Sequence, residues 1–330
     1  MSRRDKQRHG PRIEAVTDGQ FDEGFFRRFL ATHQNQDGGW GYFPHAPSSV
    51  EATSWALIAL GQRQEDAPAG DALERGREWL VKVQLKDGSW PPFPGLAVGC
   101  WVTSLAALTL HRAGTFQDAV ARGRDWLLAE RPAEGSLRWR LGHIWSGRRV
   151  VRQDNSLLGW SWTPRAASWV EPTAHALLFL QNLPALPSKA IKRRRLAEAM
   201  LLDRRCPGGG WNNGNPLVYG VAGIPSVGPT CWALLALAHS AHVPELQSSL
   251  NWLEGAYRDV KGAASLALAH RCLRACGREV SSLIPDIINF YPRNRFFDST
   301  VTIAWLKLAL AEGQKPSGEV SMKDATREPR

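Results

Sequence analysis

The apolar residues of this 330-residue chain mark two kinds of helical segment that alternate along it. In the first kind they recur three or four positions apart, as at Phe25, Phe26, Phe29 and Leu30, which predicts an amphipathic helix with one buried stripe. In the second kind they are almost continuous, as in residues 55–60, which predicts a helix buried on all sides. The alternation predicts six pairs, each an outer helix followed by an inner one, at 22–33 and 49–61, 71–84 and 98–113, 117–130 and 168–182, 189–203 and 227–241, 245–257 and 261–276, and 279–290 and 297–312.

A glycine- and tryptophan-containing loop recurs between outer and inner helices. Clear copies occupy residues 36–41 and 84–90, and looser copies occupy residues 159–162 and 208–211. A unit that returns every few tens of residues is typical of stacked supersecondary units sharing one core. The sequence therefore predicts an all-α protein, a closed (α/α)6 toroid over residues 21–312, with every inner helix beginning on one rim of a central cavity. Three tryptophans of the repeat are expected to be buried and to hold the loops: Trp40, Trp90 and Trp211.

This repeat resembles the QW repeat of triterpene cyclases and the related repeat of protein prenyltransferase β subunits. The resemblance covers most of residues 22–312 and implies the toroid fold with an isoprenoid or other apolar ligand in its centre. The acid motif of the cyclases, DxDD, is absent, and its nearest equivalent is the segment Val170–Ala174, which places Glu171 where the acid would stand. Glu51 and Asp298 occupy similar places before other inner helices. Neither the Asp-x-Cys zinc motif nor the DDxxD magnesium motif is present, so no metal and no cofactor are expected.

Acid-initiated cyclisation needs a carboxylic acid that stays protonated near neutral pH, and burial in an apolar cavity raises a carboxyl pKa. His175, four residues after Glu171, lies within helical reach of it. Both Glu51 and Glu171 also suit the positive end of a helix dipole, and His175 also suits a buried core position. Carbocations are stabilised by aromatic faces. The aromatic candidates for the cavity wall are Trp55, Trp101, Trp162, Trp169, Tyr219, Trp232, Phe296 and Trp305.

Two connectors between outer and inner helices are unusually long, at residues 131–167 and 206–226. Long loops beside a site are often lids or binding segments, and we expect the first of these to cover the site of Glu171.

Composition and charge narrow the class of protein further. The formal net charge is +10, which favours an anionic membrane surface or a diphosphate substrate, or simply a basic solvated surface. No aromatic residues interleave with the basic clusters, so nucleic-acid binding is not expected. The five cysteines show no CxxC spacing, which fits a reducing, cytoplasmic setting without disulfides. Residues 1–20 and 313–330 are polar and are expected to be disordered tails, with no secretory signal and no membrane-spanning run.

Three functions remain open at this point. The leading hypothesis is a terpene-cyclase-like or prenyltransferase-like isomerase or transferase with Glu171 as acid. The second is a non-catalytic toroid that binds a lipid or a protein at its rim. The third is a carbohydrate-active toroid enzyme that uses two of Glu51, Glu171 and Asp298 as a carboxylate pair.

Overall fold

The computed structural model describes residues 21–62, 67–136, 153–280, 282–292 and 299–313. The predicted tail at 1–20, residues 314–330 of the predicted tail at 313–330, and the candidates Phe296 and Asp298 lie outside the described residues. Gly313, by contrast, is the last residue of a helix. The inner helices are α2 (Val50–Leu60), α4 (Val102–Arg112), α7 (Val170–Asn182), α9 (Val227–Ala236), α11 (Ala263–Ala275) and α13 (Thr300–Gly313). The outer helices are α1 (Glu23–Thr32), α3 (Ala67–Val83), α5 (Gln117–Ala129), α8 (Ser188–Asp203), α10 (Pro244–Ala256) and α12 (Leu283–Phe290).

Short elements complete the described structure. Single 3-10 turns occur at Ala133–Gly135, Ala238–Ser240 and Tyr257–Asp259. One small antiparallel hairpin, β1 (Leu217–Val218) with β2 (Val221–Ala222), stands in the connector before α9. The hairpin was not predicted, because its strands are too short to show an alternating pattern.

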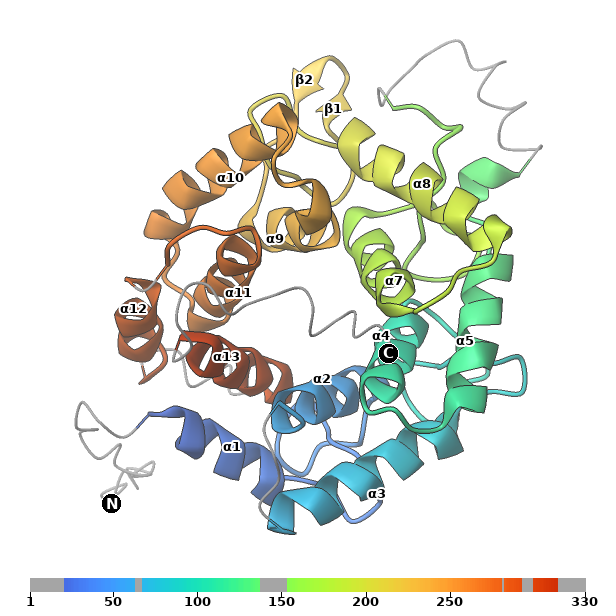
Figure 1. Cartoon of the computed structure of the whole chain (residues 1–330), viewed down its shortest axis with the longest axis vertical. Coiled ribbons are helices and arrows are strands. Elements are labelled where there is room, and N and C mark those ends of the chain that lie inside the picture. The colour runs from blue at the N-terminus through green and yellow to red at the C-terminus, as the bar shows by residue number, and fades with distance from the viewer. Residues whose placement is uncertain (1–20, 63–66, 137–152, 281, 293–298, 314–330) are drawn as a thin grey trace, which may run out of the picture.

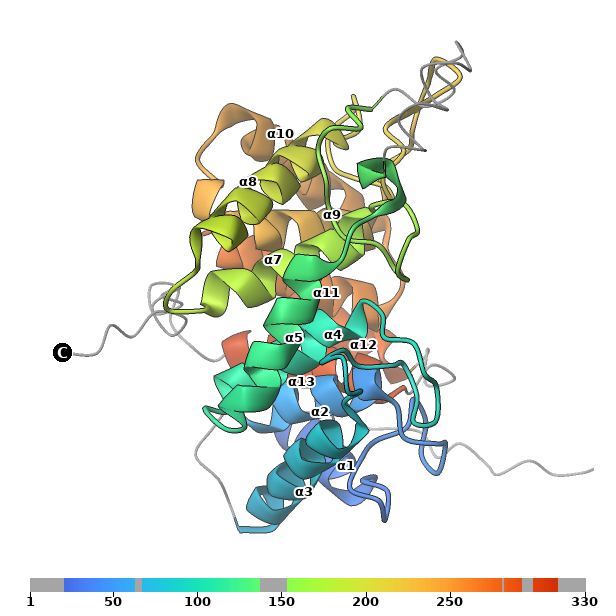
Figure 2. The same cartoon turned by 90° about the vertical axis from the view of Figure 1, so that its right-hand side faces the viewer.

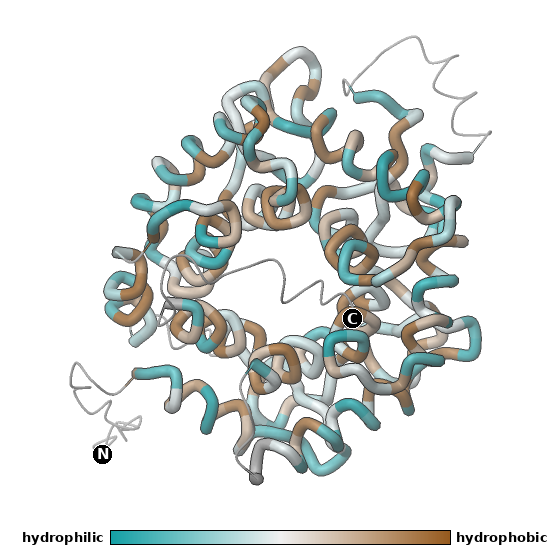
Figure 3. The backbone as a smooth tube through the Cα atoms, viewed as in Figure 1, coloured by the Kyte–Doolittle hydropathy of each residue, from teal (hydrophilic) through white to brown (hydrophobic). Residues whose placement is uncertain are grey.

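The inner helices form a closed ring (Figure 1). Contacts run from α2 to α4, α7, α9, α11, α13 and back to α2. The seam is hydrogen-bonded: the Thr300 backbone N–H donates to the Tyr42 carbonyl at 2.8 Å, and the Thr300 hydroxyl donates to the Gly41 carbonyl at 2.6 Å. Hydrophobic residues dominate the inner ring, and hydrophilic residues gather on the outer helices (Figure 3). The predicted closed, all-α toroid is therefore confirmed.

The same hydrogen-bonded clamp recurs in four copies of the repeat. In each, a tryptophan backbone N–H donates to a threonine hydroxyl at the start of an inner helix, and the indole N–H donates to a carbonyl near the end of an outer helix. The distances are 2.8 and 2.7 Å for Trp40 with Thr53 and Leu30, 2.9 and 2.7 Å for Trp90 with Thr103 and Leu80, 2.8 and 2.9 Å for Trp160 with Thr173 and Leu127, and 2.8 and 2.6 Å for Trp211 with Thr230 and Leu201. Each clamp joins one loop to both helices of its pair and so sets where the inner helix begins.

Two of the four clamp tryptophans, Trp40 and Trp90, lie against a glycine of the neighbouring outer helix. A Cβ added to Gly76 would lie 2.7 Å from Cζ3 of Trp40, and one added to Gly123 would lie 2.7 Å from Cζ3 of Trp90. Since both indoles are fully buried, they have no room to withdraw.

Replacing Gly123 by alanine should therefore lower the free energy of unfolding by about 1–3 kcal/mol, even though alanine is the better helix former. Gly255 is the matched control, because it also lies within an outer helix and an added Cβ would meet nothing within 4 Å. Its change to alanine should stabilise the protein by up to about 1 kcal/mol. Urea unfolding of both variants checks this, and equal effects at the two sites would contradict the packing argument.

Candidate functional site

The repeat clamp places two glutamates at equivalent positions on one rim. Glu51 and Glu171 are the second residues of α2 and α7, and each stands two positions before the clamp threonine of its copy, Thr53 or Thr173. The amino ends of the inner helices thus carry both carboxyl groups on the same side of the toroid. We call this side, where the inner helices begin, the amino rim. Both side chains are partly buried.

Glu51 is held by a phenol. The Tyr42 hydroxyl donates a short hydrogen bond to Oε2 of Glu51. Burial raises the pKa of Glu51, and the bond from Tyr42 lowers that pKa. Burial and the carboxylate together raise the pKa of Tyr42 above its ordinary value, so the phenol remains a donor.

Glu171 has the properties of an acid that works near neutral pH. Burial, with a contribution from the negative charge of Glu51, raises its pKa to about 7. Its side chain is 26 % exposed, so the carboxyl group is accessible from the rim. Its nearest charged or titratable neighbour on α7 is His175, whose Nε2 lies 4.0 Å from Oε1 of Glu171.

His175 is enclosed by indoles and stays neutral. Its ring centroid lies 4.3 Å from that of Trp232, 5.1 Å from Trp101 and 6.1 Å from Trp55. Burial lowers its pKa to about 3. His175 therefore cannot form an ion pair with Glu171 near pH 7. A neutral imidazole does not stabilise the ionised form of Glu171 as a positive charge would.

Tryptophan rings meet on the axis of the toroid, one turn below the glutamates. Trp55, Trp232 and Trp305 form a triangle with centroid separations of 5.6, 5.7 and 5.8 Å. Because α2 and α9 stand opposite each other in the ring, contact between Trp55 and Trp232 means that side chains fill the axis at this level. We call these three indoles the aromatic floor; it contacts His175, one helical turn after Glu171, through Trp55 and Trp232.

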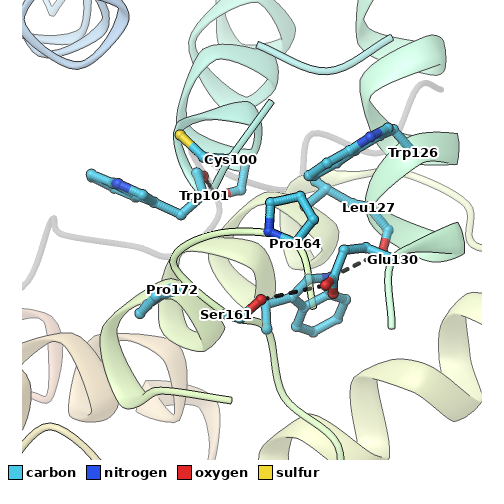
Figure 4. Close-up of a pocket in the computed structure, with 10 residues that line it drawn as sticks. Cys100, Trp101, Trp126, Leu127, Glu130, Ser161, Pro164 and Pro172 are labelled. Atoms are coloured by element: carbon cyan, nitrogen blue, oxygen red, sulfur yellow. Dashed lines mark hydrogen bonds between the residues drawn. The ribbon is translucent and has the colours of Figure 1, made fainter. Parts of the chain in front are cut away.

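A small, mostly apolar pocket lies beside this floor, between α4, α5 and the segment that precedes α7 (Figure 4). Its walls include Trp101, Trp126 and Pro164, and Pro172 follows Glu171 in the chain. Glu130 and Ser161 point toward each other at its edge, and burial raises the pKa of Glu130. Its free volume is about that of one water molecule.

Comparisons with known proteins agree with this architecture. No protein-family profile matches the chain. Drimenyl diphosphate synthase from Streptantibioticus cattleyicolor is 40 % identical over 70 residues, and squalene–hopene cyclase from Bradyrhizobium diazoefficiens is 39 % identical over 74. The aligned stretches span about a fifth of this chain, but only 13 % and 11 % of those relatives.

Solved structures resemble the chain over nearly its whole length. A type II terpene cyclase from Scytonema in complex with merosterolic acid A superposes with a TM-score of 0.60 at 14 % identity, over 88 % of this chain and 95 % of that one. A protein from Actinoplanes gives a TM-score of 0.60 at 18 % identity, over 89 % and 100 %. The chain shares the α/α-toroid fold of these structures, and over short stretches its sequence is similar to terpene cyclases.

Most aromatic residues that the sequence singled out gather in this terpene-cyclase-like toroid around His175. Trp162 packs edge-on against Trp101 at 5.2 Å, and the half-buried Trp169 stands at the amino end of α7. Tyr219 lies apart from them, 78 % exposed on the β1–β2 hairpin, because the hairpin directs it into solvent. Trp40, Trp90 and Trp211 are fully buried in the clamps.

Tyr42 was not singled out from the sequence of this toroid. Tyr42 follows the clamp residue Trp40 by two positions, as Trp162 follows Trp160, so alignment of the repeat copies could have found it. Burial and the charge of Glu51 raise the pKa of Cys100 to about 11. Its thiol is therefore neutral and supplies no charge to the site.

The described part of the toroid contains neither a cluster of metal-ligating side chains nor a helix that could span a membrane. There, no group of three or more His, Cys, Asp or Glu side chains is arranged to hold a metal ion. Among the same residues, no helix combines the length and apolar character needed to cross a bilayer.

Proposed function

We propose that this toroid binds a linear isoprenoid at its amino rim and cyclises it, with Glu171 as the acid. The observation that carries the proposal is a partly buried carboxyl group with a pKa of about 7, one helical turn from a histidine that indoles surround. A carboxyl of ordinary pKa would be almost fully ionised at neutral pH and could not donate a proton.

The reaction is written with its atoms balanced. The π electrons of a terminal alkene form a C–H bond with the proton of Glu171, which leaves a carbocation on the substrate and a carboxylate on the protein. Internal alkenes then attack the cation in turn, and the last cation loses a proton to a base, so the net change is an isomerisation. The faces of Trp55, Trp101 and Trp232 offer negative potential without a nucleophile, worth about 0.5–2 kcal/mol each to a cation.

The relatives indicate the substrate class. Drimenyl diphosphate synthase is named for an isoprenoid diphosphate product, and the Scytonema cyclase was solved with geranylgeranyl dihydroxybenzoate as substrate. A linear isoprenoid with a polar head suits this toroid too, because the net charge of +10 favours an anionic head group.

Room for the substrate would come from the segment that precedes α7. Trp162 and Pro164 of this segment lie over Trp101 and beside the small pocket. Displacing this segment would join the pocket to the space above Glu171. This is the lid role expected of the 131–167 connector, whose residues 137–152 lie outside the described residues.

The test is direct. The purified protein is incubated with squalene, farnesyl diphosphate and geranylgeranyl diphosphate, and the products are analysed by gas chromatography and mass spectrometry. Cyclic products formed by the wild type support the proposal. Tightly bound, unconverted isoprenoid in the co-purifying lipids would instead favour the non-catalytic binder, which the filled axis at Trp55 and Trp232 also suits.

We also propose that the amino rim contacts an anionic membrane surface in the cytoplasm. The five free cysteines fit this compartment, because its reducing conditions keep thiols from forming disulfides. The loops before α2, α4 and α9 lie on one side of the toroid (Figure 2). They expose Phe43, Phe93, Leu96, Val98, Tyr219, Val221 and Ile224, which are 37–86 % exposed. Apolar loop tips on a basic protein suit insertion into the interface of an anionic bilayer.

Replacing Tyr219, Val221 and Ile224 together by serine should weaken binding to phosphatidylglycerol vesicles at least about tenfold, because burying even one such side chain is worth roughly 1.5 kcal/mol. Vesicle co-sedimentation measures this. Leu202→Ser is the control, since Leu202 is 44 % exposed on the outer helix α8. Wild-type protein that fails to sediment with these vesicles would refute the membrane contact.

A further inference from the structure

Two carboxyl groups lie on the amino rim, and of the two only Glu51 accepts a side-chain hydrogen bond from the described residues. We propose that Tyr42 and Glu51 are positioning residues that hold the negative charge on Glu51 and so keep the acidic proton on Glu171. This inference rests on the proposed function, in which Glu171 is the acid. Neither Tyr42 nor Glu51 is required to touch the substrate.

The two glutamates stand on α2 and α7, which only α4 separates in the ring. They occupy the same place in two copies of the repeat, and the residues one helical turn later, Trp55 and His175, have ring centroids 6.1 Å apart. The negative charge of Glu51 contributes to the raised pKa of Glu171. Two carboxyl groups so placed in a partly desolvated site resist double ionisation and titrate as a pair that retains one proton over a wide pH range.

Tyr42 breaks the symmetry of this pair. Its hydroxyl donates to Glu51, and its carbonyl accepts the seam hydrogen bond from Thr300, so the donor is fixed where the ring closes. A hydrogen bond to a carboxylate favours the ionised form of that carboxyl group. The negative charge is therefore more stable on Glu51 than on Glu171.

Glu171 has no comparable hydrogen bond to stabilise its ionised form. Among the described residues no hydrogen-bond donor reaches it, since Nε2 of His175 is 4.0 Å away. At the repeat position of Tyr42, the copy that contains Glu171 carries Trp162, which packs on Trp101 instead. Among the described residues, the other titratable groups beside the pair are Cys100 and His175, and both are neutral near pH 7 because burial shifts their pKa values to about 11 and about 3. No cation among these groups offsets the repulsion, so the proton stays on Glu171.

The test follows the proton itself, without a substrate. Infrared titration of the full-length protein detects the carbonyl band of a protonated carboxyl group, and the band lost in Glu171→Gln belongs to Glu171. In the wild type this band should disappear as pH rises through about 7. Glu51→Gln removes the like charge, so the midpoint should fall by about one pH unit.

Tyr42→Phe removes the donor and leaves the carboxyl pair. The proton should then be shared, so that just below the wild-type midpoint the Glu171 band weakens and a second band appears that Glu51→Gln abolishes. A purely structural role for Tyr42 would change stability without moving the proton between bands.

Two matched controls keep the result interpretable. Glu245→Gln changes the second residue of the outer helix α10, the same helix position as Glu51, and Tyr219→Phe changes an exposed phenol. Neither should alter the Glu171 band, and cooperative thermal unfolding checks that every variant is folded. An unchanged midpoint in folded Glu51→Gln, or an unchanged band pattern in folded Tyr42→Phe, would overturn the inference. If Glu171→Gln retained turnover, the proposed function would fail while the titration still decided where the proton resides.

Discussion

Glu171→Gln should remove turnover of any isoprenoid that the wild type cyclises, by about 100- to 10,000-fold, and leave the fold and ligand binding intact. Glutamine has nearly the shape of glutamic acid, but its amide cannot donate an acidic proton to an alkene. Because Glu171 is partly exposed and makes no hydrogen bond among the described residues, its replacement leaves no partner unsatisfied.

The rate of the wild-type reaction supplies an independent check. Only the protonated form of Glu171 can donate, and its pKa is raised to about 7 from an ordinary value near 4.5. Activity should therefore be full below that pKa and fall as pH rises through it. The same sign applies to stability: a carboxyl whose pKa is raised in the folded state stabilises the fold below its unfolded pKa and loses that contribution as pH rises from about 4.5 to about 7.

Product formation is measured by mass spectrometry across this range, with Glu245→Gln as the control. Full turnover in Glu171→Gln would leave Glu171 as a residue that complements the dipole of α7. The non-catalytic toroid would then be the better account only if the wild type also lacks turnover.

Trp40→Ala should lower the free energy of unfolding by about 3–5 kcal/mol. Trp40 is completely buried, and its removal leaves a large cavity between α1, α2 and α3. It also leaves the Leu30 carbonyl without the indole donor that now reaches it at 2.7 Å. Gly76, whose Cα lies against the indole, has no side chain with which to fill the space.

Chemical unfolding of this variant is compared with Phe43→Ala, three residues later in the same loop. Phe43 is 49 % exposed, so its truncation should cost well under 1 kcal/mol. An unchanged unfolding midpoint for Trp40→Ala would mean that the clamps do not hold the toroid together.

Local sequence determined the repeating unit of this protein. A clamp needs a tryptophan, a threonine at the start of the inner helix and a small residue opposite the indole. The tryptophan and the threonine form a short-range pattern that recurs along the chain, whereas the small residue lies on the outer helix of the next pair. Helical periodicity predicted the start of four inner helices to within two residues, whereas α13 begins at Thr300 rather than 297 and α4 at Val102 rather than 98. The candidate acids were also proposed from sequence, since the glutamate before the clamp threonine stands out in two copies.

Tertiary structure decided which of these residues meet. The repeat marks the position of Tyr42, but only the folded chain shows that its hydroxyl donates to Glu51 on α2. Trp55 and Trp232 belong to distant copies, and their contact across the axis exists only because the ring closes. Local patterns specify each helix pair through hydrogen bonds within that pair, whereas the pKa of Glu171 depends on burial and on a charge contributed by another pair. That is why the candidate acid could be named from the sequence, while its proton and its partner could be assigned only from the folded ring.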